Sequence, residues 1–152
     1  MKLGEALSQL KKEQNRLTRL ISLRKENIYV EQGKKTKIDP KRLSEEIDNK
    51  IKEIRELKIK IQNTNLNTRI NDKNLTLAEA IIKINDLRDK ISNLSKLFDK
   101  EREYLFRDKD MKDRIAQLDE QEIEKEIVEL ENEKTQLDNK IQITNWTTEL
   151  ID

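Results

Sequence analysis

The chain has 152 residues, with 32 basic and 31 acidic side chains and neither cysteine nor histidine. This length fits a single domain. The lack of cysteine excludes disulfides and thiol catalysis, and the lack of histidine excludes imidazole general bases and most zinc or haem sites. Leu, Ile, Val and Phe make up about 28% of the chain and the net charge is close to zero, so we expect the chain to fold.

The first residues of the chain and its apolar runs bear on its location. Glu5, Lys11 and Lys12 interrupt the opening residues, so we expect no secretory signal. No apolar run approaches the roughly 18 residues that a membrane-spanning helix needs. The sequence therefore predicts a cytoplasmic protein with no membrane partner.

Two helices are predicted in the first half, because apolar residues recur there every three or four positions. The first covers about residues 2–31, and Gly33 is expected to cap its C-terminus. The second covers about residues 40–70. Asp39 is its expected N-cap, and Pro40 suits the first helical position because its missing N–H has no partner there in any case.

Two further helices are predicted in the second half. The third covers about residues 76–105 and begins with a capping box, in which Thr76 and Glu79 each satisfy a free backbone N–H group of the other. The fourth covers about residues 120–150 and begins after a second acidic N-cap, Asp119. With so few Gly, Pro and aromatic residues, strands have little support.

The two halves of the sequence repeat each other. Residues 3–7 match residues 77–81 at an offset of 74, and residues 61–68 match residues 141–148 at an offset of 80. The second match, with the pattern I-Q-x-T-N-x-x-T, is not a pattern that coiled-coil composition readily produces. The sequence therefore predicts an all-α fold, in which a duplicated antiparallel helical hairpin forms an elongated four-helix bundle or coiled-coil arrangement.

Charge divides along the boundary between the repeats. Residues 1–75 carry a net charge of +8, and residues 76–152 carry −7, so the expected single domain consists of a basic and an acidic hairpin. This complementarity favours docking of unlike hairpins within a chain or between chains. The alternative is a well-solvated surface whose charge asymmetry steers folding only weakly.

Polar side chains gather at one end of the predicted bundle. In an up-down bundle the first and third helices start at the end where the second and fourth finish. The polar end cluster at that position consists of Glu5, Glu79, Thr64, Asn65, Thr68, Arg69, Thr144, Asn145, Trp146 and Thr148. One interpretation is a structural polar layer that fixes helix register. The other is an oxygen-lined pocket for a hard cation or small polar ligand, with Trp146 as its apolar wall.

Two charged loops carry weaker signals. Residues 107–113 superficially suggest a calcium loop, but Lys112 stands at a ligand position, so we expect a hairpin loop without a metal. A basic loop contains Lys34, Lys35, Lys37, Lys41 and Arg42. No stacking aromatics accompany it, so we expect a solvated turn and no nucleic-acid partner, with polyanion binding as the alternative.

Several stretches resemble a family of small bacterial helical, coiled-coil proteins that often carry the name "septicolysin". The stretches are MKLGEAL at 1–7, TNLNT at 64–68, LTLAEA at 75–80 and NWTTEL at 145–150, so the resemblance spans nearly the whole chain. It implies an all-helical fold and brings no established activity, cofactor or catalytic residue.

The name implies a thiol-activated, cholesterol-dependent pore-forming toxin. This sequence departs from that toxin group because it has no Cys and no Trp-rich membrane loop, and because it is too short. We therefore expect a non-enzymatic structural or interaction protein, without a catalytic residue, metal or cofactor, that forms a homo-oligomer through its helical faces. The alternatives are a ligand- or cation-binding module at the polar end cluster and a cytolysin, which red-cell lysis would reveal.

Overall fold

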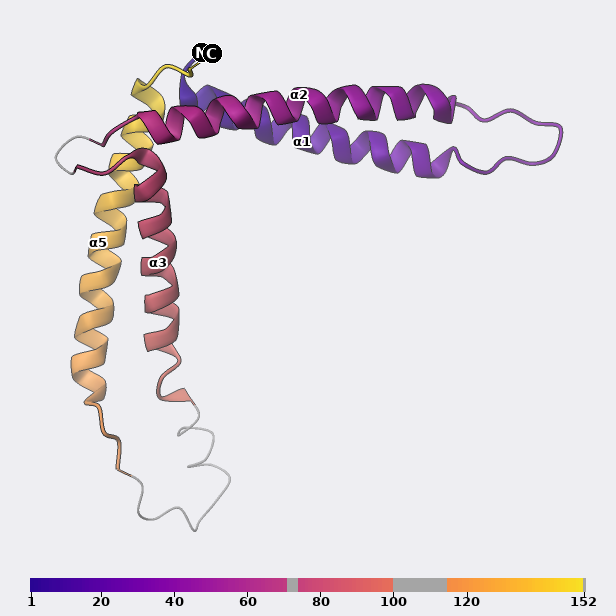
Figure 1. Cartoon of the computed structure of the whole chain (residues 1–152). Helices are drawn as coiled ribbons and strands as arrows, with labels where there is room; N and C mark the ends of the chain where they lie inside the picture. The colour runs from indigo at the N-terminus through magenta and orange to yellow at the C-terminus, as the bar shows by residue number, and fades with distance from the viewer. Residues whose placement is uncertain (71–73, 100–114, 152) are drawn as a thin grey trace, which may run out of the picture. The chain divides into compact units, whose positions relative to one another are not determined.

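Four α-helices form the part of the chain that the computed structural model describes, namely residues 1–70, 74–99 and 115–151 (Figure 1). The helices are α1 Leu3–Glu26, α2 Pro40–Asn67, α3 Leu77–Ser95 and α5 Glu120–Thr147. Those residues contain no strand, only two isolated backbone bridges. The predicted all-α, four-helix fold is confirmed.

The chain folds as two compact units. The first consists of Met1–Thr68 together with Thr144–Asp152, and the second consists of Arg69–Ile143. The first unit thus contains α1, α2 and the last turn of α5, whereas the second contains α3 and the rest of α5.

In the first unit, α1 and α2 run side by side (Figure 1). The buried apolar residues of α2 follow one stripe with spacings of four and seven residues, which is the period of a helix that buries one face. Leu3 and Ala6, in the first turn and a half of α1, are fully buried. The buried stripe of α2 consists of Leu43, Ile47, Ile54 and Ile61.

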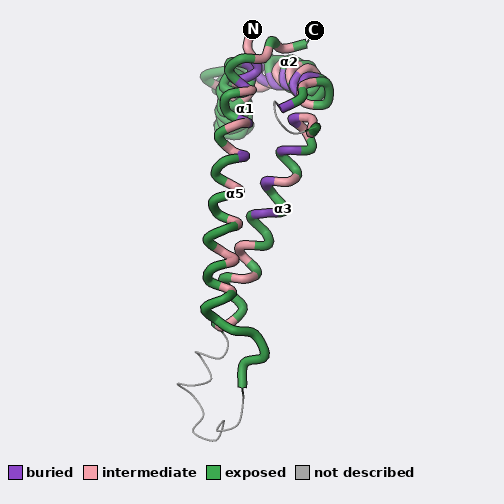
Figure 2. The backbone as a smooth tube through the Cα atoms, turned by 90° about the vertical axis from the view of Figure 1, so that its left-hand side faces the viewer, coloured by how far each residue is buried: buried purple, intermediate pink, exposed green. Residues whose placement is uncertain are grey.

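In the second unit, α3 packs beside α5 in the antiparallel sense. Lys83 forms an ion pair with Glu133 at 2.7 Å, and Lys90 forms one with Glu126 at 2.8 Å. From Lys83 to Lys90 the chain advances seven residues along α3, while the partner on α5 moves back seven residues. The two helices therefore run in opposite directions. Figure 2 shows buried positions recurring along α3 between exposed ones. The core consists of Leu77, Ala80, Ile84 and Leu87 from α3 with Leu137 and Ile141 from α5.

The predicted N-caps are confirmed. Asp39 accepts a hydrogen bond from the N–H two residues later at 2.9 Å, with Pro40 as the first helical residue, and Asp119 accepts the equivalent bond at 2.9 Å. Thr76 and Glu79 form the capping box of α3. Local sequence sufficed here, because a cap needs only the residues next to the helix start.

The helix ends differ from the predictions. Helix α1 ends at Glu26, five residues early, because Asn27 closes it: the Asn27 N–H donates to the carbonyls of Leu23 and Arg24, and its Nδ2 donates to Leu23 at 2.8 Å. Gly33 has a φ of +84°, but it lies in the following loop and caps no helix.

Helix α3 ends at Ser95 rather than near residue 105, and its Ser95 hydroxyl donates to the carbonyl of Ile91 at 2.7 Å. Such a bond offers the backbone an alternative to the helical pattern. Residues 100–114, and with them the predicted loop at 107–113, lie outside the described residues. Within those residues, no helix combines the length and apolar character needed to cross a bilayer.

Candidate functional site

The structure assigns the predicted polar end cluster to both units. Arg69 and Glu79 belong to the second unit. The other members, all in the first unit, are Glu5, Thr64, Asn65, Thr68, Thr144, Asn145, Trp146 and Thr148.

Backbone pairing joins the two ends of the described chain within the first unit. The Leu3 N–H donates to the Thr148 carbonyl at 2.9 Å, and the Leu150 N–H donates to the Met1 carbonyl at 2.8 Å. These bonds flank an antiparallel bridge between Lys2 and Glu149. We call this arrangement the terminal pairing. It explains why α5 ends at Thr147, three residues before the predicted end: the chain must become extended in order to pair.

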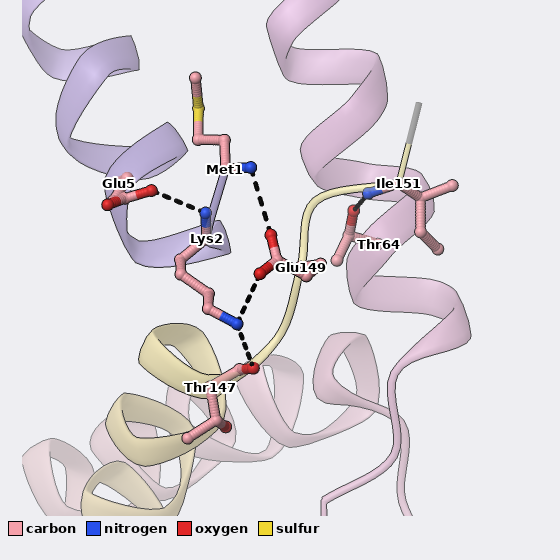
Figure 3. A network of polar contacts seen from close by, with 7 residues as sticks. All are labelled: Met1, Lys2, Glu5, Thr64, Thr147, Glu149 and Ile151. Atoms are coloured by element: carbon pink, nitrogen blue, oxygen red, sulfur yellow. Dashed lines mark hydrogen bonds and ion pairs between the residues drawn. The ribbon is translucent and has the colours of Figure 1, made fainter.

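Side chains strengthen the terminal pairing (Figure 3). The Lys2 Nζ lies 2.6 Å from a Glu149 oxygen and donates to the Thr147 carbonyl at 3.1 Å. The Met1 amine lies 3.2 Å from the other Glu149 oxygen. The Lys2 hydrogen bond, followed by that from the amine, lowers the pKa of Glu149 below its ordinary value. Sequence reasoning missed Lys2 and Glu149, although Glu149 stands at the repeat position of Arg69, a member of the predicted cluster.

Thr64 is the most deeply buried member of the polar end cluster. Its hydroxyl donates to the Lys60 carbonyl at 2.8 Å and accepts from the Ile151 N–H at 3.0 Å. The hydroxyl therefore serves as both donor and acceptor inside the unit. Asn145 is also buried, whereas Asn65 is half-buried.

The second unit contains a counterpart of the terminal pairing. Arg69 forms an antiparallel bridge with Thr76, and the Ile70 N–H donates to the Leu75 carbonyl at 3.0 Å. At the offset of 80, Arg69 and Ile70 correspond to Glu149 and Leu150. At the offset of 74, Thr76 and Leu75 correspond to Lys2 and Met1. The sequence repeat thus extends to backbone hydrogen bonding. We call this second arrangement the internal pairing.

The two carboxylates of the polar end cluster cap the starts of their own helices. Glu5 accepts from the Lys2 N–H at 2.8 Å. Glu79 accepts from the Thr76 N–H at 2.7 Å and from its hydroxyl at 2.9 Å, and these bonds lower the pKa of Glu79. Arg69 donates to the carbonyl and side-chain oxygen of Asn74, at 3.1 Å each. Both carboxylates therefore satisfy free backbone N–H groups at helix starts.

Trp146 packs directly on Gly4. A Cβ atom added to Gly4 would lie 2.8 Å from Cδ2 and 2.9 Å from Cε3 of the indole, closer than two carbon atoms normally approach. Gly4 is buried, while about half of the Trp146 side chain remains exposed. The indole therefore has one face on the α1 backbone and another toward solvent. Sequence reasoning selected Trp146 but missed its partner.

An inward-facing ion pair lies between α1 and α2, outside the predicted cluster. The Lys50 Nζ lies 2.7 Å from Glu13 and also contacts Glu53, and the Lys50 and Glu13 side chains are 13% and 17% exposed. The signal for Lys50 was its spacing, because it continues the buried stripe of α2. Beside it is a hollow of about 360 Å³ lined by Met1, Gln9, Glu13, Glu53, Leu57, Lys60 and Leu150.

This ion pair predicts an acid-sensitive contribution to stability. The Lys50 hydrogen bond and positive charge hold the pKa of Glu13 below its ordinary value of 4.5. A lowered folded pKa stabilises the protein above the unfolded pKa, and that stabilisation is lost as the pH falls through the folded value. The Glu13→Gln variant should therefore lose less thermal stability than the parent chain between about pH 5 and pH 3.

Melting temperatures measured across that range test the prediction. Glu45→Gln, which removes an exposed carboxylate from α2, is the matched control and should retain the acid sensitivity of the parent. Equal acid sensitivity in the Glu13→Gln variant and the parent would contradict the assignment.

Among the described residues, no group of three or more acidic side chains is arranged to hold a metal ion.

Comparison with known proteins gives the chain a family. A functionally unknown conserved protein from Corynebacterium diphtheriae, known from a crystal structure, is 30% identical over 99% of both chains, with a TM-score of 0.88. No protein among those with curated descriptions matches the chain. Residues 10–150 match the model of a family of unknown function, DUF6847. The chain therefore belongs to the DUF6847 family.

Proposed function

We propose that the protein is a non-enzymatic helical interaction protein of the cytoplasm that self-associates through outward apolar faces of its helices. The observation that carries this proposal is a row of exposed apolar residues on α2. We call Ile51, Ile59 and Leu66 the outer row; the Leu66 side chain is 60% exposed. Ile59 and Leu66, seven residues apart, lie on one side of the helix away from the buried stripe, and Ile51 flanks that stripe.

The second unit offers similar surface. Ile82 on α3 and Val128 and Ile143 on α5 are all exposed. Isolated apolar residues are common on protein surfaces, but rows of them along long helices are surfaces that a second chain can cover. A symmetric homo-oligomer is the usual way in which such a surface is covered.

The non-enzymatic part of the proposal rests on how the polar groups are used. The carboxylates of Glu5 and Glu79 bind backbone N–H groups at helix starts, and the Thr64 hydroxyl bonds within the fold. Groups that satisfy the backbone in this way support a structural role.

Absolute mass from size-exclusion chromatography with light scattering tests the proposal. We expect a multiple of 18.2 kDa, which Leu66→Lys should reduce because it places a charge in the outer row. Asn49→Lys, which adds the same charge to an exposed polar position on another face of α2, is the control and should keep the parent mass. A parent chain that remains monomeric at every concentration would rule out self-association.

The same measurement at high salt tests the role of charge. If the +8 and −7 halves attract each other between chains, then about 1 M salt should lower the mass, because the screening length falls to roughly 3 Å. An unchanged mass would show that apolar contacts alone hold the assembly.

A further inference from the structure

The loop between α1 and α2 exposes three consecutive large apolar residues. Ile28, Tyr29 and Val30 are 53%, 92% and 49% exposed. Loops run over the protein surface, and their turn positions favour small or polar residues. Three adjacent apolar residues that are about half or more exposed are therefore a feature to be explained.

This loop has a defined shape. The Ile38 N–H donates to the Asn27 side-chain oxygen at 3.2 Å, which closes the neck of the segment between them. At the far side, the Lys34 N–H donates to the Glu31 carbonyl at 3.0 Å across a tight turn, and Gly33 supplies its positive φ. We call residues 28–37 the tip loop. It extends past the ends of both helices (Figure 1).

Positive charge surrounds the apolar residues. The cations in and beside the tip loop are Lys34, Lys35, Lys37, Lys41 and Arg42, all exposed. Lys34 pairs with Glu31, and Arg42 pairs with Glu46 at 3.2 Å. Lys35, Lys37 and Lys41 form no ion pair with the residues that the structure describes, so they are available to an external anion.

We propose that the tip loop docks on the surface of an anionic lipid bilayer. Ile28, Tyr29 and Val30 enter the boundary between headgroups and acyl chains, where an aromatic ring with one polar end is favoured. The lysines meet the phosphates and the negative surface potential. The expectation of no membrane partner rested on the lack of a spanning segment, and docking at the interface does not need one.

A bilayer explains the tip loop better than a nucleic acid does. Single-stranded nucleic acids are bound by several aromatic rings on which successive bases stack. The tip loop has one aromatic ring, flanked by the aliphatic side chains of Ile28 and Val30. Aliphatic side chains neither stack on bases nor bind phosphates. Apolar and cationic groups together match the two layers of an anionic membrane surface.

Vesicle sedimentation with the full chain tests this proposal. At about 0.1 M salt, the chain should bind phosphatidylcholine vesicles that contain phosphatidylserine, and it should not bind vesicles of phosphatidylcholine alone. Tyr29→Ser should weaken binding by roughly tenfold, because it removes the most exposed apolar group. Lys35→Gln with Lys37→Gln should weaken binding by roughly fivefold per lysine.

Matched controls separate the tip loop from general charge and hydrophobicity. Lys11→Gln with Lys12→Gln removes the same charge from an exposed part of α1, and Leu97→Ser removes an exposed apolar group from the segment after α3. Both should bind vesicles like the parent. Circular dichroism and melting temperature should show that all variants remain folded.

Several outcomes would overturn the proposal. These are absence of binding to the anionic vesicles, and equal losses in the control and tip-loop variants. Tyr29-dependent binding of a single-stranded oligonucleotide without vesicle binding would assign the tip loop to nucleic acid instead. A fall in solution mass caused by Tyr29→Ser would assign it to self-association, which the outer-row variant tests independently.

Discussion

Replacing Leu3 with alanine should lower the free energy of unfolding by about 2–5 kcal/mol. The Leu3 side chain is 0% exposed, and its N–H is part of the terminal pairing. Truncation removes apolar contacts and leaves a cavity that a position fixed by backbone hydrogen bonds cannot readily close. Leu77, the residue that corresponds to Leu3 in the repeat, is also 0% exposed and should show a loss of the same size.

Urea denaturation of matched pairs measures these losses. Leu7→Ala and Ile81→Ala remove side chains that are each 37% exposed, one helical turn beyond Leu3 and Leu77. Each control should cost clearly less than its partner, because less apolar surface is lost and no enclosed cavity forms. If Leu3→Ala costs no more than Leu7→Ala, the packing described for the first turn of α1 is wrong.

Gly4→Ala should destabilise the protein by about 1–3 kcal/mol, although alanine is the better helix former. The gain in helix propensity is roughly 1 kcal/mol. The opposing effect is the contact of the new Cβ with Cδ2 and Cε3 of Trp146, at 2.8 and 2.9 Å. The indole is rigid, so relief requires the whole ring to leave the α1 backbone, and its packing on Gly4 is then lost.

Trp146 itself reports the outcome, because it is the only tryptophan of the chain. Its fluorescence emission should shift to longer wavelength in Gly4→Ala, since a displaced ring meets more water. The second repeat has Ala78 at the position of Gly4, and the first has Leu66 at the position of Trp146. Trp146→Leu combined with Gly4→Ala should therefore recover most of the lost stability; no recovery would mean that the indole is not the cause.

The helix starts were predictable from the sequence, whereas the ends were not. Asp39 and Thr76 act on N–H groups within three residues, so the neighbouring residues determine the start. The end of α5 depends on a partner elsewhere in the chain. After Thr147 the chain pairs with residues more than a hundred positions earlier. The spacing of apolar residues along α5 gives no indication of that partner.

The polar end cluster shows the same division between local and distant causes. Sequence alone placed Glu5 and Glu79 near helix starts, and both do cap those starts. The partner of Thr64 is the N–H of Ile151, which lies 87 residues away. The spacing of Lys50 along α2 indicates that it faces inward, but not that its partner is Glu13 on the neighbouring helix. Contacts of this kind follow from packing between helices and not from the spacing within one.

The likeness of the terminal and internal pairings has a consequence for chain connectivity. Leu150 bonds to Met1 in the same way that Ile70 bonds to Leu75. A circularly permuted gene could join the present ends with a short linker and open the chain between Ile70 and Asn74. Both sets of backbone hydrogen bonds would then remain. The peptide connection would run through the terminal pairing, and the chain ends would lie at the internal pairing. The fold should therefore tolerate either order of its two hairpins.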